Sequence, residues 1–451
     1  MTGATGLVGS SLGEKLTDLG HSIVVVTRNS VKAREQLTFS ADIIICDLNN
    51  IPLSPENFNG IDAIVNLVGE SIDGRWSRKK KNEILNSRVS SSKNLLKNCP
   101  SSVKTIITAS AQGIYGDRGN EELNEQSKEG EGFLSDVCRD WEAEFKNRQQ
   151  RVVILRLGIV LTKKGGMLKK ISALFQKNLG AILGTGNQWM SYISLNDLVN
   201  VFTNALTNEK YTGVINAANN NPVTNAVFTN ALSKQLNVRQ LPRVPSFVLK
   251  IVLGEMSHLV LDSTRVNPQR LNELGFHFND NNLDKILTEE LSLMRDHYSL
   301  FYSEQFVPFE IEKVFMFFGD HLNLEKITPD ILHFRTDFIS TPIIAKDTII
   351  QYRLKIRGFP VKWTTLIKSW DCPDEFIDMQ IKGPYNFWKH KHKFRKVKNG
   401  TLMIDEVQYK VPMGKLGKLV AGNFVENDVS QIFAHRREVI AKYNFDLHRV
   451  I

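Results

Sequence analysis

Cysteine is scarce in this chain of 451 residues. Its four cysteines are Cys46, Cys99, Cys138 and Cys372, and no two of them form a Cys-x-x-Cys pair. Widely spaced thiols argue against a disulfide-held scaffold and against a cysteine-ligated zinc module, and they are typical of a reducing compartment. We therefore expect a cytoplasmic protein.

Long apolar runs are also missing. No stretch approaches the roughly 20 residues that a membrane-spanning helix needs. The richest one, residues 247–261, is interrupted by Lys250, Gly254, Glu255 and His258. The first residues lack the basic segment followed by an apolar one that marks a secretory signal. We expect no integral membrane segment.

The excess of positive charge is moderate. Lys and Arg number 57 against 48 Asp and Glu, which gives a formal net charge of +9. Such a charge is compatible with anionic ligands and does not by itself indicate a nucleic acid partner. Residues 382–398 carry seven basic side chains and no acidic one, with aromatic residues between them. An anionic membrane or a nucleic acid is one interpretation of this segment.

Alternation along this segment favours a simpler interpretation. In a strand, successive side chains point to opposite faces. One face would then hold Lys389, Lys391, Lys393 and Arg395, and the other His390, His392 and Phe394. We interpret the basic face as the solvated side of a strand and expect no nucleic acid partner.

The first 300 residues alternate between short strands and helices. β-branched runs fall at residues 23–26, 43–45, 63–68, 105–108 and 152–155. They are continuous, as in strands buried on both faces of a parallel sheet. Helical patterns at 79–97 and 133–148 lie between them. This predicts the α/β class, with a Rossmann-like doubly wound parallel sheet.

The pattern changes near residue 300. Aromatic and β-branched stretches now alternate with period two, at 348–356, 361–370, 376–381, 387–397 and 401–411. Such stretches separated by turn residues predict antiparallel strands. An amphipathic helix follows, with Asn423 three residues before Glu426 as its expected N-cap. A second domain of the α+β class is therefore expected.

The chain opens on a glycine loop in which Gly3, Gly6 and Gly9 are spaced Gly-x-x-Gly-x-x-Gly. Glycine lets the backbone turn tightly beside a pyrophosphate, and the N-terminus of the following helix attracts the phosphates. Thr5, Leu7 and Val8 belong to the same loop and helix start. We favour dinucleotide binding over the alternative, a purely structural glycine turn.

Arg28 indicates which dinucleotide binds. It follows Thr27 at the end of the second strand, where an acidic residue would hold the ribose 2′-OH of NAD and an arginine suits a 2′-phosphate. We predict NADP(H); the alternative is a solvated loop cation. Only Met1 and Thr2 precede Gly3, although the loop should follow a central strand. We expect roughly five to seven further residues ahead of Met1, a usual strand length.

These residues resemble an atypical branch of the extended short-chain dehydrogenase/reductases. It is the sugar-nucleotide epimerase-like family, whose bacterial members are sometimes labelled cell-division inhibitors. The matching motifs run in order along the chain: Thr2 to Gly9, Asn66-Leu67-Val68-Gly69-Glu70, Tyr115-Gly116-Asp117-Arg118-Gly119, Leu155-Arg156-Leu157-Gly158 and Gly184-Thr185-Gly186-Asn187-Gln188-Trp189. The resemblance implies a Rossmann-like NADP-binding domain over residues 1–240 and a small C-terminal subdomain over 241–297.

The resemblance also implies individual cofactor contacts. It places Thr27 and Arg28 at the adenosine phosphate. It adds these further contacts: Leu67, Val68, Glu83, Arg88 and Val160. Alternatively, Glu83 and Arg88 are surface charges, and the three apolar residues are part of the core.

Ordinary members of this superfamily use a Tyr-x-x-x-Lys pair, in which the lysine lowers the tyrosine pKa for acid–base work. The matching position here reads Val137-Cys138-Arg139-Asp140-Trp141, without tyrosine or lysine. Ser110 and Tyr115 remain candidate acid–base groups, although we prefer a packing role for the ring of Tyr115. Arg265 and Arg270 either hold an anionic substrate group or form surface ion pairs.

Two functions stay open. One is an NADP(H)-dependent reductase or epimerase-like enzyme that acts on a small molecule. The other is a non-catalytic NADP(H)-responsive regulatory protein. No metal site is expected, because His258, His277 and His321 stand apart from other ligands.

Residues 298–451 resemble the START-like helix-grip superfamily, also called polyketide cyclase/dehydrase-like. The match consists of Phe306-Val307-Pro308, Asn323-Leu324-Glu325-Lys326, Gly383-Pro384-Tyr385 and Trp388-Lys389-His390-Lys391-His392. The resemblance implies a sheet curled around a long helix, with an apolar cavity for a hydrophobic ligand; a solid core is the alternative. The fusion suggests that this domain presents or senses a hydrophobic substrate.

Overall fold

The computed structural model describes residues 1–356, 358–411 and 414–447. The chain divides into two compact units. Unit 1 consists of Met1–Ser30 and Ala41–Ser292, and unit 2 of Val31–Ser40 and Leu293–Ile451. No helix in the described part of the chain is both long and apolar enough to span a membrane. The predicted limits of the three domains stay predictions.

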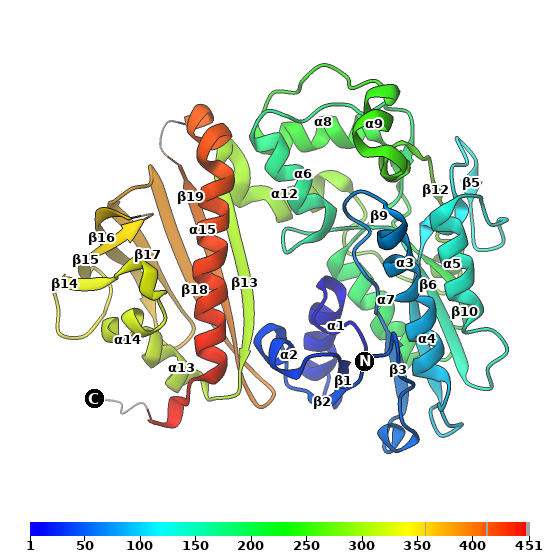
Figure 1. Cartoon of the computed structure of the whole chain (residues 1–451), viewed down its shortest axis with the longest axis horizontal. Coiled ribbons are helices and arrows are strands. Elements are labelled where there is room, and N and C mark those ends of the chain that lie inside the picture. Colours follow the sequence, from blue (N-terminus) through cyan, green and yellow to red (C-terminus); the bar gives the residue numbers. More distant parts are fainter. Residues whose placement is uncertain (357, 412–413, 448–451) are drawn as a thin grey trace. The chain divides into compact units, whose positions relative to one another are not determined.

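Unit 1 contains a parallel sheet, as expected for its continuous β-branched runs (Figure 1). The strands stand in the order β2-β1 and β3-β4-β6-β10. Their bounds are β1 (Val24–Thr27), β2 (Asp42–Ile45), β3 (Ala63–Asn66), β4 (Thr105–Ala111), β6 (Arg151–Leu157) and β10 (Gly213–Ala217). The predicted Rossmann-like α/β architecture is confirmed.

Thr2 joins the two parts of this sheet. It forms parallel bridges with Val26 of β1 and with Asn66 of β3. Its backbone N–H donates to the carbonyl of Val65 at 3.0 Å, and the N–H of Val26 donates to the carbonyl of Met1 at 3.0 Å. The glycine loop therefore leaves the sheet between β1 and β3. The longer first strand stays a prediction.

The helices of unit 1 follow its strands. Their bounds are α1 (Leu7–Asp18), α3 (Arg78–Asn86), α4 (Val89–Leu96), α5 (Phe133–Ala143), α6 (Gly166–Gln176), α7 (Leu195–Thr207), α8 (Asn225–Leu236), α9 (Ser246–Leu253), α10 (His258–Leu261), α11 (Gln269–Glu273) and α12 (Leu283–Leu291). Short strands complete it: β5 (Glu122–Leu123), β7 (Ile159–Leu161), β8 (Trp189–Met190), β9 (Tyr192–Ser194), β11 (Val223–Thr224) and β12 (Arg265–Val266).

One helix predicted over 79–97 is divided into α3 and α4. The Ser87 hydroxyl lies at the break, donates to the carbonyl of Ile84 at 3.0 Å and accepts from the N–H of Glu70 at 2.9 Å. A serine that bonds neighbouring backbone competes with the helical pattern. The break makes Arg88 the N-cap residue of α4.

Unit 2 contains an antiparallel sheet of seven strands in the order β13-β19-β18-β17-β16-β15-β14. Their bounds are β13 (Ser299–Val307), β14 (Arg335–Ile339), β15 (Ile349–Ile356), β16 (Phe359–Asp371), β17 (Glu375–Lys382), β18 (Phe387–Val397) and β19 (Gly400–Lys410). The five predicted strands of this region are confirmed. On β18, His390, His392 and Phe394 are buried, as the alternation predicted.

The helices of unit 2 are α13 (Ile311–Phe318), α14 (His321–Lys326) and α15 (Gly414–Lys442). Unit 2 also includes α2 (Ser30–Gln36) except for its first residue. Helix α15 lies along the sheet (Figure 1). Its Val429 and Phe433 belong to one buried cluster with Val407 and Tyr409 of β19. The predicted N-cap at Asn423 is wrong, because α15 begins at Gly414. Its glycines gave no helical signal, and tertiary packing overrides such weak local preference.

Phe315 of α13 tests the core of unit 2. Its side chain is fully buried, and its ring centroid lies 4.9 Å from that of Trp370 and 5.3 Å from that of Phe394. Phe315→Ala should lower the free energy of unfolding of unit 2 by roughly 3–5 kcal/mol, because it removes buried surface and leaves a cavity. Urea denaturation followed by tryptophan fluorescence measures the change.

The control is Ile343→Ala, since Ile343 is 74% exposed. An exposed substitution should change stability by about 0.5 kcal/mol or less. Equal effects of the two substitutions would contradict this assignment of the core.

Candidate functional site

The glycine loop closely approaches the backbone of Leu67, the residue that follows β3. Gly3 has a φ of +63°, which disfavours other residues, and a Cβ added there would lie 2.4 Å from the carbonyl oxygen of Leu67. A Cβ on Gly9 would lie 2.2 Å from the carbonyl oxygen of Gly3. Both positions therefore require glycine, one for the turn and one for packing of α1.

Helix α1 begins directly after this loop. Its N-cap, Gly6, makes no side-chain hydrogen bond, and the first turn contains no acidic residue. The first N–H groups of a helix lack partners inside it and carry a partial positive charge. Thr5 and Gly6 are exposed, and Leu7 and Val8 are partly exposed. The loop and helix start can thus hold an anionic diphosphate.

Arg28 lies just beyond the end of β1. It is exposed, and Thr27 beside it is partly exposed. The guanidinium lies near Glu70, on the segment that follows β3. A hydrogen bond from Lys80 at 2.8 Å chiefly lowers the pKa of Glu70, and the charges of Arg28 and Arg88 lower it further. Three cations, Lys80, Arg28 and Arg88, therefore act on Glu70.

The segment after β3 carries Leu67 and Val68, both partly exposed. The Leu67 N–H donates to the hydroxyl of Thr2 at 3.2 Å, and that hydroxyl donates to Asn66 Oδ1 at 2.7 Å. Asn66 is fully buried and bonds Ser92 and Thr108 through its Nδ2. This polar network fixes Leu67 beside the loop.

Arg88 forms a hydrogen bond with the backbone of the same segment. Its Nη2 donates to the carbonyl of Glu70 at 3.1 Å and its Nη1 to that of Ile84 at 3.1 Å. A Cβ on Gly69 would lie 3.1 Å from Nη2. Burial lowers the pKa of Arg88. Glu83, in contrast, is exposed, with Lys79 as an ion-pair partner at 3.9 Å.

Val160 of β7 lies close to Gly166, which is also close to Leu7 at the start of α1. A Cβ on Gly166 would lie 3.4 Å from Leu7 Cδ2 and 3.8 Å from the carbonyl oxygen of Val160. The structure therefore brings together the loop, Arg28, Leu67, Val68, Arg88 and Val160. It leaves Glu83 as a surface charge. The cofactor role of each residue stays a prediction.

Ser110 and Tyr115 belong to a buried polar network. The Ser110 hydroxyl donates to Glu142 Oε1 at 2.6 Å. Arg156 donates to both oxygens of Glu142, from Nε at 2.9 Å and from Nη2 at 2.8 Å. Its Nη1 donates to the hydroxyl of Tyr115 at 3.0 Å, and that hydroxyl donates to Asn216 Oδ1 at 2.7 Å.

This network constrains acid–base chemistry. Tyr115 is 0% exposed, and burial raises the pKa of its hydroxyl, against the lowering effect of Arg156. Such a phenol stays protonated near neutral pH. Its bonds favour the predicted packing alternative, and acid–base roles for Ser110 and Tyr115 stay predictions.

Helix α5 occupies the place of the usual Tyr-x-x-x-Lys pair. Its residues Val137, Cys138 and Trp141 are buried. Desolvation raises the pKa of the Cys138 thiol to about 12, and Trp141 Nε1 donates to Ser92 Oγ at 3.1 Å. The Trp141 bond joins α5 to Ser92 of α4, and none of these three side chains is a tyrosine or a lysine.

Each of the two arginines considered for substrate binding forms an ion pair with a glutamate. Arg270 Nη1 lies 2.9 Å from Glu273 Oε2, and Arg265 Nη2 lies 3.7 Å from Glu122 Oε2. The Arg265 guanidinium also lies 4.7 Å from the ring centroid of Trp189. The ion-pair alternative therefore describes both residues in this structure.

Two groups of polar residues were not predicted from the sequence. Glu142 and Asn216 complete the network around Ser110, but they lie far apart in the chain and on different elements. In unit 2, Asp378, His390 and His392 form a group in which one ligand atom of each lies within 4.8 Å of the others. The alternation of β18 placed both histidines on one inward face, and that was the available signal.

Comparison with known proteins agrees with the geometry of unit 1. Residues 1–218 match the model of the NAD dependent epimerase/dehydratase family, and residues 244–290 match a domain of unknown function, DUF1731. The epimerase family protein SDR39U1 homolog, chloroplastic, of Arabidopsis thaliana is 39% identical over 290 residues, which are 62% of this chain and 82% of that protein. The chain belongs to the epimerase family.

Other epimerase family proteins agree. One from Mycobacterium bovis is 33% identical over 293 residues, 64% of this chain and 95% of that protein. The structure of human epimerase family protein SDR39U1 (isoform 2) with NADPH has a TM-score of 0.58 at 28% identity, covering 64% of this chain and 98% of that one. A Corynebacterium glutamicum nucleoside-diphosphate sugar epimerase has a TM-score of 0.52 at 31% identity, covering 64% and 57%.

The Glu142–Arg156 pair predicts a non-additive effect on stability. Arg156→Met should cost roughly 3–5 kcal/mol of unfolding free energy, because it leaves the buried Glu142 carboxylate unpaired. The double substitution Glu142→Gln, Arg156→Met should cost less, since neither buried charge remains. Chemical denaturation of the two variants measures the difference. A double variant less stable than the single one would contradict a structural ion pair.

Proposed function

We propose that unit 1 binds NADP(H) and acts as an atypical reductase or epimerase-like oxidoreductase on a small molecule. The observation that carries the proposal is the fit of the glycine loop to a diphosphate. Side chains at Gly3 or Gly9 would collide with backbone, so the loop keeps its surface open at the start of α1. Arg28 stands exposed beside it.

Each part of the cofactor would have its own partners. The N–H groups at the start of α1 would hold the diphosphate. Thr27 and Arg28 would hold the 2′-phosphate of the adenosine. Leu67, Val68 and Val160 would line the apolar side, and Arg88 would position the segment that carries Leu67. NADPH supplies a hydride when bound.

NADP is preferred over NAD for two reasons. A guanidinium, and no carboxylate, follows β1. The human epimerase family protein SDR39U1, which is similar in fold and sequence, was solved with NADPH. Glu70 lies near Arg28, but it bonds Lys80 directly. The guanidinium thus stays exposed for a phosphate.

A second candidate is a non-catalytic NADP(H)-responsive regulatory protein. The observation that favours it is α5, where buried Cys138 and Trp141 occupy the place of the usual proton relay. In the enzyme alternative, Ser110 would polarise the substrate and Tyr115 would act as the acid–base group. Tyr115 would then need to exchange its bond with Asn216 during turnover.

For unit 2 we propose a START-like domain that binds a hydrophobic ligand. Its sheet and α15 enclose a cavity of about 640 Å³ whose walls include Phe318, Trp363, Trp370 and Trp388. That volume suits a small organic ligand. In the proposed division, residues 1–240 bind the cofactor, 241–297 complete the substrate side, and 298–451 bind the hydrophobic molecule. A cytoplasmic location is part of the proposal.

Substitution of Arg28 tests the choice of cofactor. Arg28→Ala should weaken NADPH binding roughly 10- to 100-fold, since a hydrogen bond to a charged group contributes about 1.5–3 kcal/mol. NADH binding should be unchanged, because NADH has no 2′-phosphate. Isothermal titration of both cofactors measures the ratio. Equal affinities of the unaltered protein for NADPH and NADH would reject the arginine assignment.

Arg239→Ala is the matched control, because Arg239 is an exposed arginine of unit 1 beyond the end of α8. It should bind NADPH like the unaltered protein. Gly6→Val should weaken both cofactors, because an exposed side chain at that position would occupy the phosphate surface. A Gly6→Val protein that binds NADPH normally would refute the loop as the diphosphate site.

Turnover separates the two candidate functions. NADPH absorbance should fall in the presence of small-molecule pools if unit 1 is an enzyme, and Ser110→Ala should slow that loss while NADPH affinity stays constant. A protein that binds NADPH tightly but consumes none across many such pools would support the regulatory candidate.

A further inference from the structure

One wall of the cavity in unit 2 is polar. Asp378 of β17 and His390 and His392 of β18 all line it. Both histidines are buried, and the side chain of Asp378 keeps 17% of its surface exposed. The remaining wall is largely aromatic and aliphatic. Three potential metal ligands therefore face a cavity whose remaining lining is mostly apolar.

A fourth residue, Asp405 of β19, lies behind the histidines. Its Oδ1 lies 2.8 Å from His390 Nε2 and 3.1 Å from His392 Nδ1. On the other side, Asp378 Oδ2 lies 3.5 Å from His390 Nδ1 and 3.1 Å from His392 Nε2. Each imidazole thus stands between two carboxylates.

This arrangement defines which ring nitrogens face Asp378. A carboxylate that accepts a proton from one nitrogen of an imidazole leaves the other nitrogen as an acceptor or ligand. Asp405 occupies His390 Nε2 and lies beside His392 Nδ1. His390 Nδ1 and His392 Nε2 are then the nitrogens beside Asp378. A carboxylate behind a ligating histidine is a common support of metal sites.

Basic side chains of α15 lie beside the group. Asp405 lies 3.5 Å from Nη1 of Arg436, a buried residue of α15. Arg437, the next residue of α15, also interacts with the charge of Asp405, so guanidinium groups compensate the carboxylate behind the histidines.

We propose that Asp378, His390 and His392 bind a divalent first-row transition metal ion, with Asp405 as the residue that positions the two imidazoles. Two imidazole nitrogens and one carboxylate oxygen form a donor set that Zn²⁺, Co²⁺ and Fe²⁺ accept. The ion would lie between His392 Nε2 and Asp378 Oδ2, which are 3.1 Å apart, and its binding requires the proton of the His392 ring to be on Nδ1, toward Asp405.

Three protein ligands leave a coordination position open toward the cavity. That position takes a water molecule or an oxygen or nitrogen atom of the cavity's ligand. The ligand class is therefore an apolar molecule with one such donor atom. This last step rests on the ligand-binding role proposed for unit 2, whereas the metal site itself does not.

Cobalt binding tests the metal site in the full chain. The protein is stripped with a chelator, dialysed and titrated with Co²⁺ and, separately, with Zn²⁺ in a calorimeter. We expect one ion per chain and visible d–d absorption bands for Co²⁺ in a site with nitrogen ligands. A chain that binds no ion stoichiometrically would overturn the proposal and leave a hydrogen-bonded network only.

Substitutions locate the ion. Asp378→Asn and His392→Ala should each abolish the stoichiometric site and the cobalt bands. Asp405→Asn should weaken binding roughly 10- to 100-fold, as for other residues behind metal ligands. Circular dichroism verifies that each variant is folded, and the conservative Asp378→Asn keeps the size of the side chain. Stoichiometric binding that survives Asp378→Asn and His392→Ala would reject these ligands.

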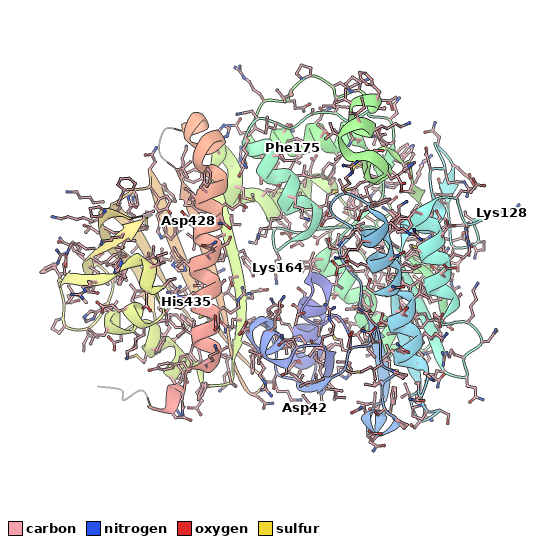
Figure 2. The ribbon with its side chains drawn as sticks, in the orientation of Figure 1. Asp42, Lys128, Lys164, Phe175, Asp428 and His435 are labelled. Carbon is pink, nitrogen blue, oxygen red and sulfur yellow. The ribbon has the colours of Figure 1, made fainter. Side chains whose placement is uncertain are left out.

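Two histidines serve as controls. His435 of α15 also lines the cavity but lies outside the group, and it is labelled in Figure 2. His258 lies at the surface, with Nδ1 2.8 Å from Asp262 Oδ1. His435→Ala and His258→Ala should keep the site, and its loss in His258→Ala would indicate adventitious surface binding. NADPH titration of the same proteins reports unit 1 separately, so failure of either proposal is recognised independently.

Discussion

The close approach of Gly3 to the carbonyl of Leu67 is the constraint on which unit 1 depends. It requires a residue without a side chain, a positive φ and a loop that leaves the sheet between β1 and β3. Thr2 reinforces it, because one hydroxyl bonds both Asn66 and the N–H of Leu67. The start of α1, the end of β1 and the segment after β3 consequently meet at one edge.

Much of this arrangement follows from local sequence. Continuous β-branched runs predicted the parallel strands, because strands covered on both faces have no polar side. Period-two alternation predicted β15 to β19 and the inward histidines of β18. The break at Ser87 and the early start of α15 did not follow, since each depends on bonds or packing with residues elsewhere. Local preference is too weak to fix such boundaries.

The candidate sites show the same limit. Glycine spacing and Arg28 lie within one short stretch, so their grouping was visible in the sequence. The network that contains Ser110 draws on α5, β6 and β10, and the surroundings of His390 come from β17, β19 and α15. Only the fold brings these residues together. For Arg265 and Arg270 the sequence left two roles open, substrate binding and ion pairing. The structure pairs Arg265 with Glu122 and Arg270 with Glu273.

The burial pattern of β18 also limits which changes the chain can accept. Its inward side chains include two imidazoles and a phenylalanine, while the side chains between them are lysines. Side chains on a strand have a period of two, so a shift by a single position exchanges the faces. Such a shift would bury ammonium groups among aromatic rings. A length change in the turn at Asn399, which joins β18 to β19 with a φ of +64°, would therefore be opposed by the burial of charge if it moved β18 by one position.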